Sequence, residues 1–164
     1  MTVPTIESFQ SIPFIPYGET VECCETLELA LCTKTPCECF SQYLELSENK
    51  IYYLLLYMRI KSYELKYEDE DFDRNAIAVG ILDDFFNSNS PFKIPERLEY
   101  SEDLASKIKS KLNKDTFNCL YSLFIGNLKA YYEEFKTSEM YYNLRDELLK
   151  MEIAYERLNA AGLI

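Results

Sequence analysis

Thiols are the first side chains in this sequence that could do chemistry, because they can pair as disulfides or bind a metal ion. The chain has six of them, at Cys23, Cys24, Cys32, Cys37, Cys39 and Cys119. Their spacing is irregular, the chain has no histidine, and no CxxC pair completes a four-ligand zinc site. The N-terminus, MTVPTIESFQ, lacks the basic start and apolar run of a signal peptide, so we expect a cytoplasmic protein with reduced thiols. We interpret the cysteines as small buried apolar side chains and free thiols, and expect no bound metal.

Clustered carboxylates are the second group that could act chemically. The acidic run Glu68–Asp71 could chelate calcium, but it lacks the alternating ligands and the glycine of an EF-hand loop. We interpret it as a solvated loop that precedes a helix N-terminus. Asp83 and Asp84 could supply an acid and a base, yet adjacent helical residues point about 100° apart. The sequence also shows no nucleophile elbow and no phosphate-binding glycine loop, so we expect no enzyme activity and no cofactor.

The net charge of −11 opposes binding to polyanions. Nucleic acids and anionic membranes both need clustered lysine and arginine, so neither is an expected partner. The most apolar window, Ile51–Ile60, is too short to span a bilayer, and we expect no membrane insertion. A basic strip runs through Lys107, Lys109, Lys111 and Lys114. It is either a solvated helix face or a docking site for an acidic peptide.

Helices are the elements that must position these groups. The chain of 164 residues is 48% hydrophobic and has only four glycines, and three of its six prolines lie in the first 16 residues, which favours an all-α fold. Residues 1–18 read as an extended arm that lies against the body. Apolar residues at helical spacing then predict seven segments: 19–31, 36–46, 48–67, 72–87, 102–112, 116–135 and 138–162. Ser47, Ser101 and Ser138 are the expected N-caps, and Gly162 is the expected stop.

Four segments, taken in order, resemble a known family. They are LCTKTPCECFSQYL (31–44), SENKIYYLLLYMRI (47–60), ILDDFFNSNSPFKI (81–94) and FKTSEMYYNL (135–144). Together they resemble the RGS homology domain, named after the regulators of G-protein signalling. The resemblance implies an all-α, RGS-like bundle of eight to nine helices, made of an antiparallel four-helix bundle plus a terminal-helix subdomain. It also implies a single domain over residues 19–164 that binds proteins during intracellular signal transduction.

The family's activating residues are largely replaced in this chain. Members that accelerate GTP hydrolysis hold the switch regions of a Gα subunit and so position groups that the GTPase already owns. Their Glu-Asn pair aligns with Asn49 and Lys50. Their second Asn aligns with Lys111, or with Asn113 if the turn shifts by two residues. Their final Asp and Arg positions align with Glu139 and Asn143. These departures resemble the branches that do not accelerate hydrolysis.

Two such branches match about equally well. The stretch YEDEDFDRNAIAVGILDDFFNSNSPF (67–92) resembles the RGS homology domains of receptor kinases, which bind Gα through the helix corresponding to residues 72–87. On that resemblance Leu82, Asp83 and Asn87 face the partner, and Val79 replaces an expected Arg. The ending FKTSEMY resembles axin, whose domain binds short motifs of a scaffold protein in Wnt signalling.

Three functions therefore compete. The first is a non-enzymatic, monomeric binding module for a Gα subunit or a scaffold-protein motif. The second is a GTPase activator, in which Asn113 and Glu139 compensate for the changes at Lys50 and Asn143. The third is a helical bundle that self-associates and is unrelated to the RGS family.

Overall fold

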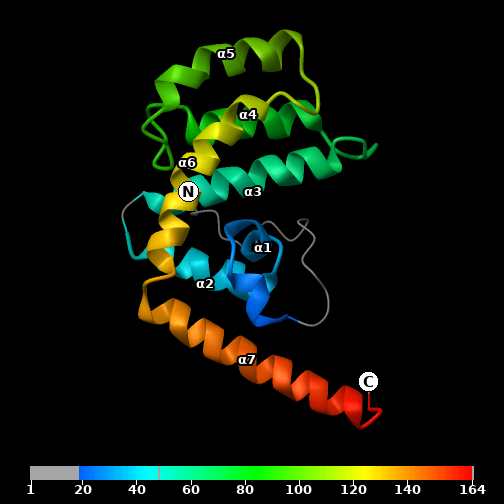
Figure 1. Ribbon diagram of the computed structural model, residues 1–164. Coiled ribbons are helices and arrows are strands. Elements are labelled where there is room, and N and C mark those ends of the chain that lie inside the picture. Colours follow the sequence, from blue (N-terminus) through cyan, green and yellow to red (C-terminus); the bar gives the residue numbers. More distant parts are fainter. Residues whose placement is uncertain (1–18, 48, 164) are drawn as a thin grey trace. The chain divides into compact units, whose positions relative to one another are not determined.

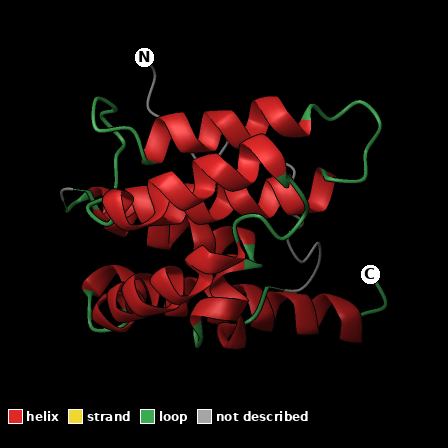
Figure 2. Ribbon diagram, turned by 90° about the horizontal axis from the view of Figure 1, so that it is seen from above, coloured by secondary structure: helices red, strands yellow, loops and turns green. Residues whose placement is uncertain are grey.

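The computed structural model describes residues 19–47 and 49–163 (Figure 1). The part of the chain that it describes consists of helices and loops and has no strand (Figure 2). The elements are η2 (Val21–Cys24), α1 (Leu27–Leu31), α2 (Lys34–Glu45), α3 (Lys50–Lys66), α4 (Arg74–Phe85), α5 (Arg97–Ser110), η3 (Asn118–Leu120), α6 (Tyr121–Phe135) and α7 (Glu139–Ala160). The all-α prediction is confirmed, and the predicted arm over residues 1–18 lies outside the described residues.

The described residues form seven α-helices, fewer than the eight or nine that the resemblance implied. The first predicted segment, 19–31, divides into a 3-10 turn and α1, because the backbone becomes extended at Thr26. The last predicted segment, 138–162, forms one continuous helix, α7. α7 runs for 22 residues without an internal glycine or proline, so nothing in its sequence breaks it into two helices.

The chain divides into two compact units. The bundle unit, within residues 47–127, contains α3, α4, α5 and the first half of α6. The terminal unit contains residues 19–46 and 128–163, with η2, α1, α2, the second half of α6 and α7. Each unit has its own aromatic core and is described by itself below.

α3 is the central helix of the bundle unit. It buries residues on much of its circumference, including the run Tyr53–Leu56, as its broad apolar stripe predicted. Towards its C-terminal end, Tyr63 is fully buried and its ring meets Phe117 edge-on at 5.2 Å. The Tyr63 hydroxyl donates a hydrogen bond of 2.6 Å to the carbonyl of Asn113. This bond holds the loop after α5 against the end of α3.

The core of the terminal unit is built around Phe135, which is fully buried. Its ring centroid lies 5.2–5.5 Å from those of Phe40, Tyr43, Tyr132 and Tyr141. These rings come from α2, α6 and α7, so one cluster joins helices that lie far apart in the sequence. Mutually tilted and edge-on rings of this kind add specific attraction to the burial of their area.

The cysteines are all free thiols. Cys23, Cys24 and Cys37 are buried in the terminal unit, and Cys32 is exposed. Burial raises the pKa of the Cys37 thiol to about 12, so this side chain stays protonated and packs as a small apolar group. Within residues 19–47 and 49–163, no group of three or more histidine, cysteine or acidic side chains could hold a metal ion.

Of the three predicted N-caps, one is confirmed and two are wrong. The Ser138 side chain accepts a hydrogen bond of 3.2 Å from the Tyr141 amide and starts α7. At α3 the capping position is Asn49, whose positive φ of 70° is a left-handed conformation that asparagine tolerates. Ser101 lies inside α5, which already begins at Arg97. Gly162, with φ of 70°, follows the end of α7 as predicted.

Replacing Ser138 with alanine should lower the free energy of unfolding by about 1 kcal/mol. The change removes the acceptor for the Tyr141 amide at the start of α7. Denaturant unfolding of the purified chain measures it. Thr137→Ala is the matched control, because Thr137 is exposed and does not cap the helix, and we expect less than half the effect. Equal losses in both variants would show that the cap is not what Ser138 contributes.

The buried tyrosines predict a loss of stability in alkali. Burial raises the pKa of Tyr63 in the bundle unit and of Tyr141 in the terminal unit to about 12, from an ordinary value of 10.0. Between these pH values the unfolded chain has lost phenolic protons that the folded chain retains. Stability is therefore complete below pH 10.0 and falls as the pH rises to about 12, by on the order of 2 kcal/mol for each tyrosine.

The variant Tyr63→Phe should reduce this alkaline loss, since phenylalanine has no proton to release. It should also cost about 1 kcal/mol at neutral pH, where the bond to the Asn113 carbonyl is missing. Denaturant unfolding at neutral and alkaline pH measures both effects. An unchanged alkaline slope in the variant would show that Tyr63 does not contribute to it.

Candidate protein-binding site

α4 carries the first half of the candidate site. The Asp73 side chain caps this helix by accepting a bond of 3.0 Å from the Ala76 amide. Ala78, Ile81 and Phe85 are fully buried. Their positions at i, i+3 and i+7 define one face of the helix, so the residues between them point sideways or outwards.

An ion pair connects α4 to α3 and distinguishes the two adjacent carboxylates, Asp83 and Asp84. Arg59 of α3 pairs with Asp84, and its guanidinium lies 5.7 Å from the centre of the Phe85 ring. A Cβ at Gly80 would stand 3.1 Å from the guanidinium, so glycine leaves room for this approach. Because Asp84 is engaged on this side, Asp83 faces away from it. The two carboxylates do not share an acid–base site.

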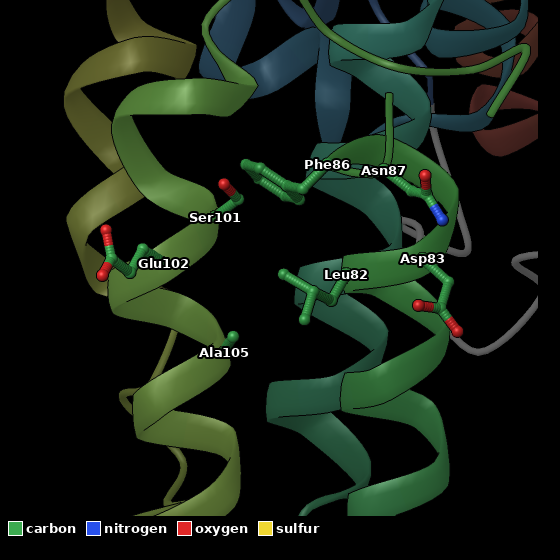
Figure 3. Close-up of a pocket in the computed structure, with 7 residues that line it drawn as sticks. All are labelled: Leu82, Asp83, Phe86, Asn87, Ser101, Glu102 and Ala105. Carbon is green, nitrogen blue, oxygen red and sulfur yellow. The ribbon is translucent and has the colours of Figure 1, made fainter. Parts of the chain in front are cut away.

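A groove runs between α4 and α5 within the bundle unit, with a volume of 280 Å³. It is lined by Leu82, Asp83, Phe86, Asn87, Ser101, Glu102 and Ala105. Figure 3 shows Leu82 and Phe86 of the α4 side pointing towards the α5 helix. Asp83 and Asn87 lie on one side of this apolar strip and Glu102 on the other (Figure 3). The groove therefore has an apolar floor between two acidic rims.

Three of the four residues predicted for the partner-facing helix line this groove: Leu82, Asp83 and Asn87. The fourth, Val79, does not line it. It lies one turn before Leu82 on α4 and is 37% exposed. Val79 thus extends the apolar face of α4 beyond the groove.

The α5 side of the groove was missed in the sequence. Ser101 and Ala105 lie beside the buried residues Leu104 and Ile108 on α5, each three residues before one of them, and Glu102 lies at the edge of this side of the helix. In the sequence, Ser101 was interpreted as the N-cap of the helix and so was not considered as part of a helix face. In the structure α5 begins at Arg97, and Ser101 lies in its second turn. The i, i+1, i+4 spacing of these three residues is the signal that marks them as one helix face.

The residues predicted for the RGS-type face occupy several places. Asn49 is exposed at the start of α3, next to Lys50. The loop between α4 and α5 lies beside this end of α3, because Phe92 meets the Tyr52 ring at 5.8 Å. The Tyr53 hydroxyl also donates to the Glu96 carboxylate at 2.7 Å.

Lys111 and Asn113 belong to the opposite end of α3. Lys111 directly follows the last residue of α5 and is exposed. Asn113 accepts a bond from Tyr63, ten residues or about 15 Å along α3 from Tyr53. The structure therefore does not bring these two positions together with Asn49 and Lys50. Glu139 and Asn143 are exposed on α7 and belong to the terminal unit.

Comparison with protein families gives one match. The model of the regulator of G protein signaling domain matches residues 26–144, which is well over half of the chain. The chain belongs to the RGS domain family. No curated protein and no solved structure matches the chain.

Membership in the RGS domain family connects this chain to G-protein signalling and to interaction with other proteins. The matched region contains the whole α4–α5 groove and ends at Leu144, within α7. The family indicates a regulatory domain, and it points to no enzyme family. Among the described helices, none combines the length and the apolar character that crossing a membrane requires.

Proposed function

We propose that this RGS domain is a non-enzymatic, monomeric binding module of the cytoplasm that recognises an activated Gα subunit through the α4–α5 groove. The observation that carries the proposal is the groove itself, where an apolar floor is combined with acidic rims. A partner helix with apolar anchors fits such a surface, as in other helix-in-groove complexes. Asp83 and Glu102 would then favour a partner that places basic side chains beside its apolar anchors.

The changes at the RGS-type face support binding without acceleration of GTP hydrolysis. A partner accelerates GTP hydrolysis by positioning groups that the GTPase already has. A misplacement of about 1 Å of the residues that do this strongly lowers the rate of hydrolysis. Here Lys50 and Asn143 differ in charge and length from the residues that the resemblance implied. Asn113, which would have to compensate, lies towards the other end of α3 from Lys50.

A nucleotide-state panel tests this function. The purified domain is titrated against several Gα subunits in three forms: with GDP, with GDP and aluminium fluoride, and with a non-hydrolysable GTP analogue. We expect similar binding to both activated forms and weaker binding to the GDP form. Single-turnover GTP hydrolysis, measured in parallel, should proceed at the same rate with and without the domain.

Two other outcomes would replace the proposal. Tight binding to the fluoride form alone, with faster hydrolysis, would identify a GTPase activator that works despite Lys50 and Asn143. Absence of binding to every Gα form would favour the scaffold-protein motif that the axin-like ending FKTSEMY suggests. Short peptides from scaffold proteins would then be the next ligands to titrate.

A further inference from the structure

Arg59 of α3 lies outside the set of residues that line the α4–α5 groove, yet it holds one of the two helices that form it. Only 18% of the Arg59 side chain and 34% of the Asp84 side chain are exposed in their ion pair. At 100° per residue, Asp84 points about 160° away from both Leu82 and Phe86. Arg59 therefore holds α4 from the side opposite the floor of the groove.

The packing of α4 leaves its rotation about its own axis weakly determined. Three residues of the helix are buried, Ala78, Ile81 and Phe85, and the first of these is small. Interlocking ridges of large side chains are what fix one helix against another, and α4 supplies only two such side chains. At Gly80 a Cβ would stand 3.1 Å from the guanidinium, so the lack of a side chain there gives Arg59 its path to the helix.

The C-terminal end of α4 is held separately, through its backbone. The Ser90 hydroxyl donates a hydrogen bond of 2.5 Å to the Asp84 carbonyl, and the Ile94 amide donates one of 2.9 Å to the Phe85 carbonyl. Asp84 is thus held twice, by its carbonyl and by its carboxylate. The backbone bonds fix where the helix ends, and the ion pair with Arg59 is the contact that resists rotation.

We propose that Arg59 is the positioning residue of the α4–α5 groove, holding Asp84 so that Leu82 and Asp83 are directed at the partner. The inference rests on the function proposed above for this groove. A helix with its side chains has a radius of about 5–6 Å, so a rotation of about 10° displaces those side chains by about 1 Å. Binding residues must be held to within about 0.5 Å, so a rotation of this size weakens binding while the domain stays folded.

Charge and position make opposite predictions for the loss of Arg59. Arg59→Met makes a chain of net charge −11 one unit more negative and leaves the Asp84 carboxylate without this ion pair, next to Asp83. Charge alone would therefore speed association with a partner that presents basic side chains. Loss of position instead speeds dissociation, because the partner meets a misaligned surface. The two rate constants separate these effects.

A double-mutant cycle tests the proposal, with rate constants measured by surface plasmon resonance against an activated Gα subunit. Arg59→Met should weaken binding about tenfold, mainly through faster dissociation, and Asp84→Asn should do about the same. The combined variant has the net charge of the unsubstituted chain and should also lose about tenfold, because both changes remove one contact. A loss of about a hundredfold in the combined variant, or unchanged dissociation in Arg59→Met, would overturn the proposal.

Tyr63→Phe is the matched control for a general loss of stability. It also removes a polar contact of α3, the bond to the Asn113 carbonyl, one turn further along the helix from Arg59. The ion pair with Asp84 stays intact in this variant. Its affinity for the Gα subunit should stay within about threefold of the unsubstituted chain. A tenfold loss in this control would show that reduced stability, and not the position of α4, weakens binding.

A measurement without a partner keeps failure of this inference distinct from failure of the proposed function. Leu82 and Ala105 line facing walls of the groove, and their methyl resonances report its geometry (Figure 3). These resonances should shift in Arg59→Met and in Asp84→Asn but not in Tyr63→Phe. Unchanged resonances in Arg59→Met would overturn the positioning role. Shifted resonances, with no binding of Gα to the unsubstituted chain, would support that role and reject the proposed function.

Discussion

Replacing Phe135 with alanine should destabilise the protein by about 3–5 kcal/mol. The side chain is fully buried, and it touches four other aromatic rings from α2, α6 and α7. Its removal leaves a cavity at the place where these helices meet, and the surrounding large rings cannot close it without leaving their preferred orientations. A loss of this size is a large part of the free energy of unfolding of a typical domain, which is roughly 5–15 kcal/mol.

Denaturant unfolding followed by circular dichroism measures this effect. Tyr142→Ala is the matched control, because it also removes an aromatic ring of the terminal unit, but one that is 56% exposed. We expect that control to change the free energy of unfolding by less than about 1 kcal/mol. Comparable losses in the two variants would mean that the cluster around Phe135 is not the centre of the core.

Replacing Leu82 with aspartate should weaken Gα binding by about 30-fold to 1,000-fold, if the α4–α5 groove is the binding site. The change places a third carboxylate in the apolar floor, between Asp83 and Glu102. Loss of a central apolar anchor in an interface typically costs about 2–4 kcal/mol, and an unpaired charge adds a desolvation cost. Asp83→Lys tests the acidic rim separately and should cost less, mainly through slower association.

Binding titrations against an activated Gα subunit measure both variants, and circular dichroism checks that each one remains folded. Ile125→Asp is the control, because it puts the same charge on another apolar residue of the bundle unit, 62% exposed and outside the groove. Its affinity should stay within about threefold of the unsubstituted chain. Full affinity in Leu82→Asp would place the binding site elsewhere on the domain.

Local patterns predicted the helices well where the signal was complete within a few residues. The start of α7 is an example, since Ser138 and the amide of Tyr141 form the cap without help from the rest of the chain. Aromatic pairs behaved similarly. In Tyr52–Tyr53 and Tyr141–Tyr142 one ring is buried and the other is more exposed, as the 100° step between adjacent helical residues requires.

Prediction failed where contacts distant in sequence decide the backbone. α5 begins at Arg97, and Ser101 is not its cap, because the preceding loop is already held in place by other elements. The Ile94 amide donates to the Phe85 carbonyl at 2.9 Å, and Glu96 accepts from Tyr53 of α3. With the loop fixed in this way, the helix starts earlier than its own capping signal indicates.

The sequence by itself determined the all-α class, the helix periodicity, the RGS family resemblance and the outward position of Leu82, Asp83 and Asn87. These properties depend on local spacing and on the order of motifs along the chain. Only the tertiary structure decided that α5 supplies the other wall of the groove and that Arg59 engages Asp84 but leaves Asp83 outside. It also decided that Lys50 and Asn113 belong to different ends of α3. The physical reason is that pairing between helices depends on side chains from both partners, and one helix's periodicity does not encode which helix it will meet.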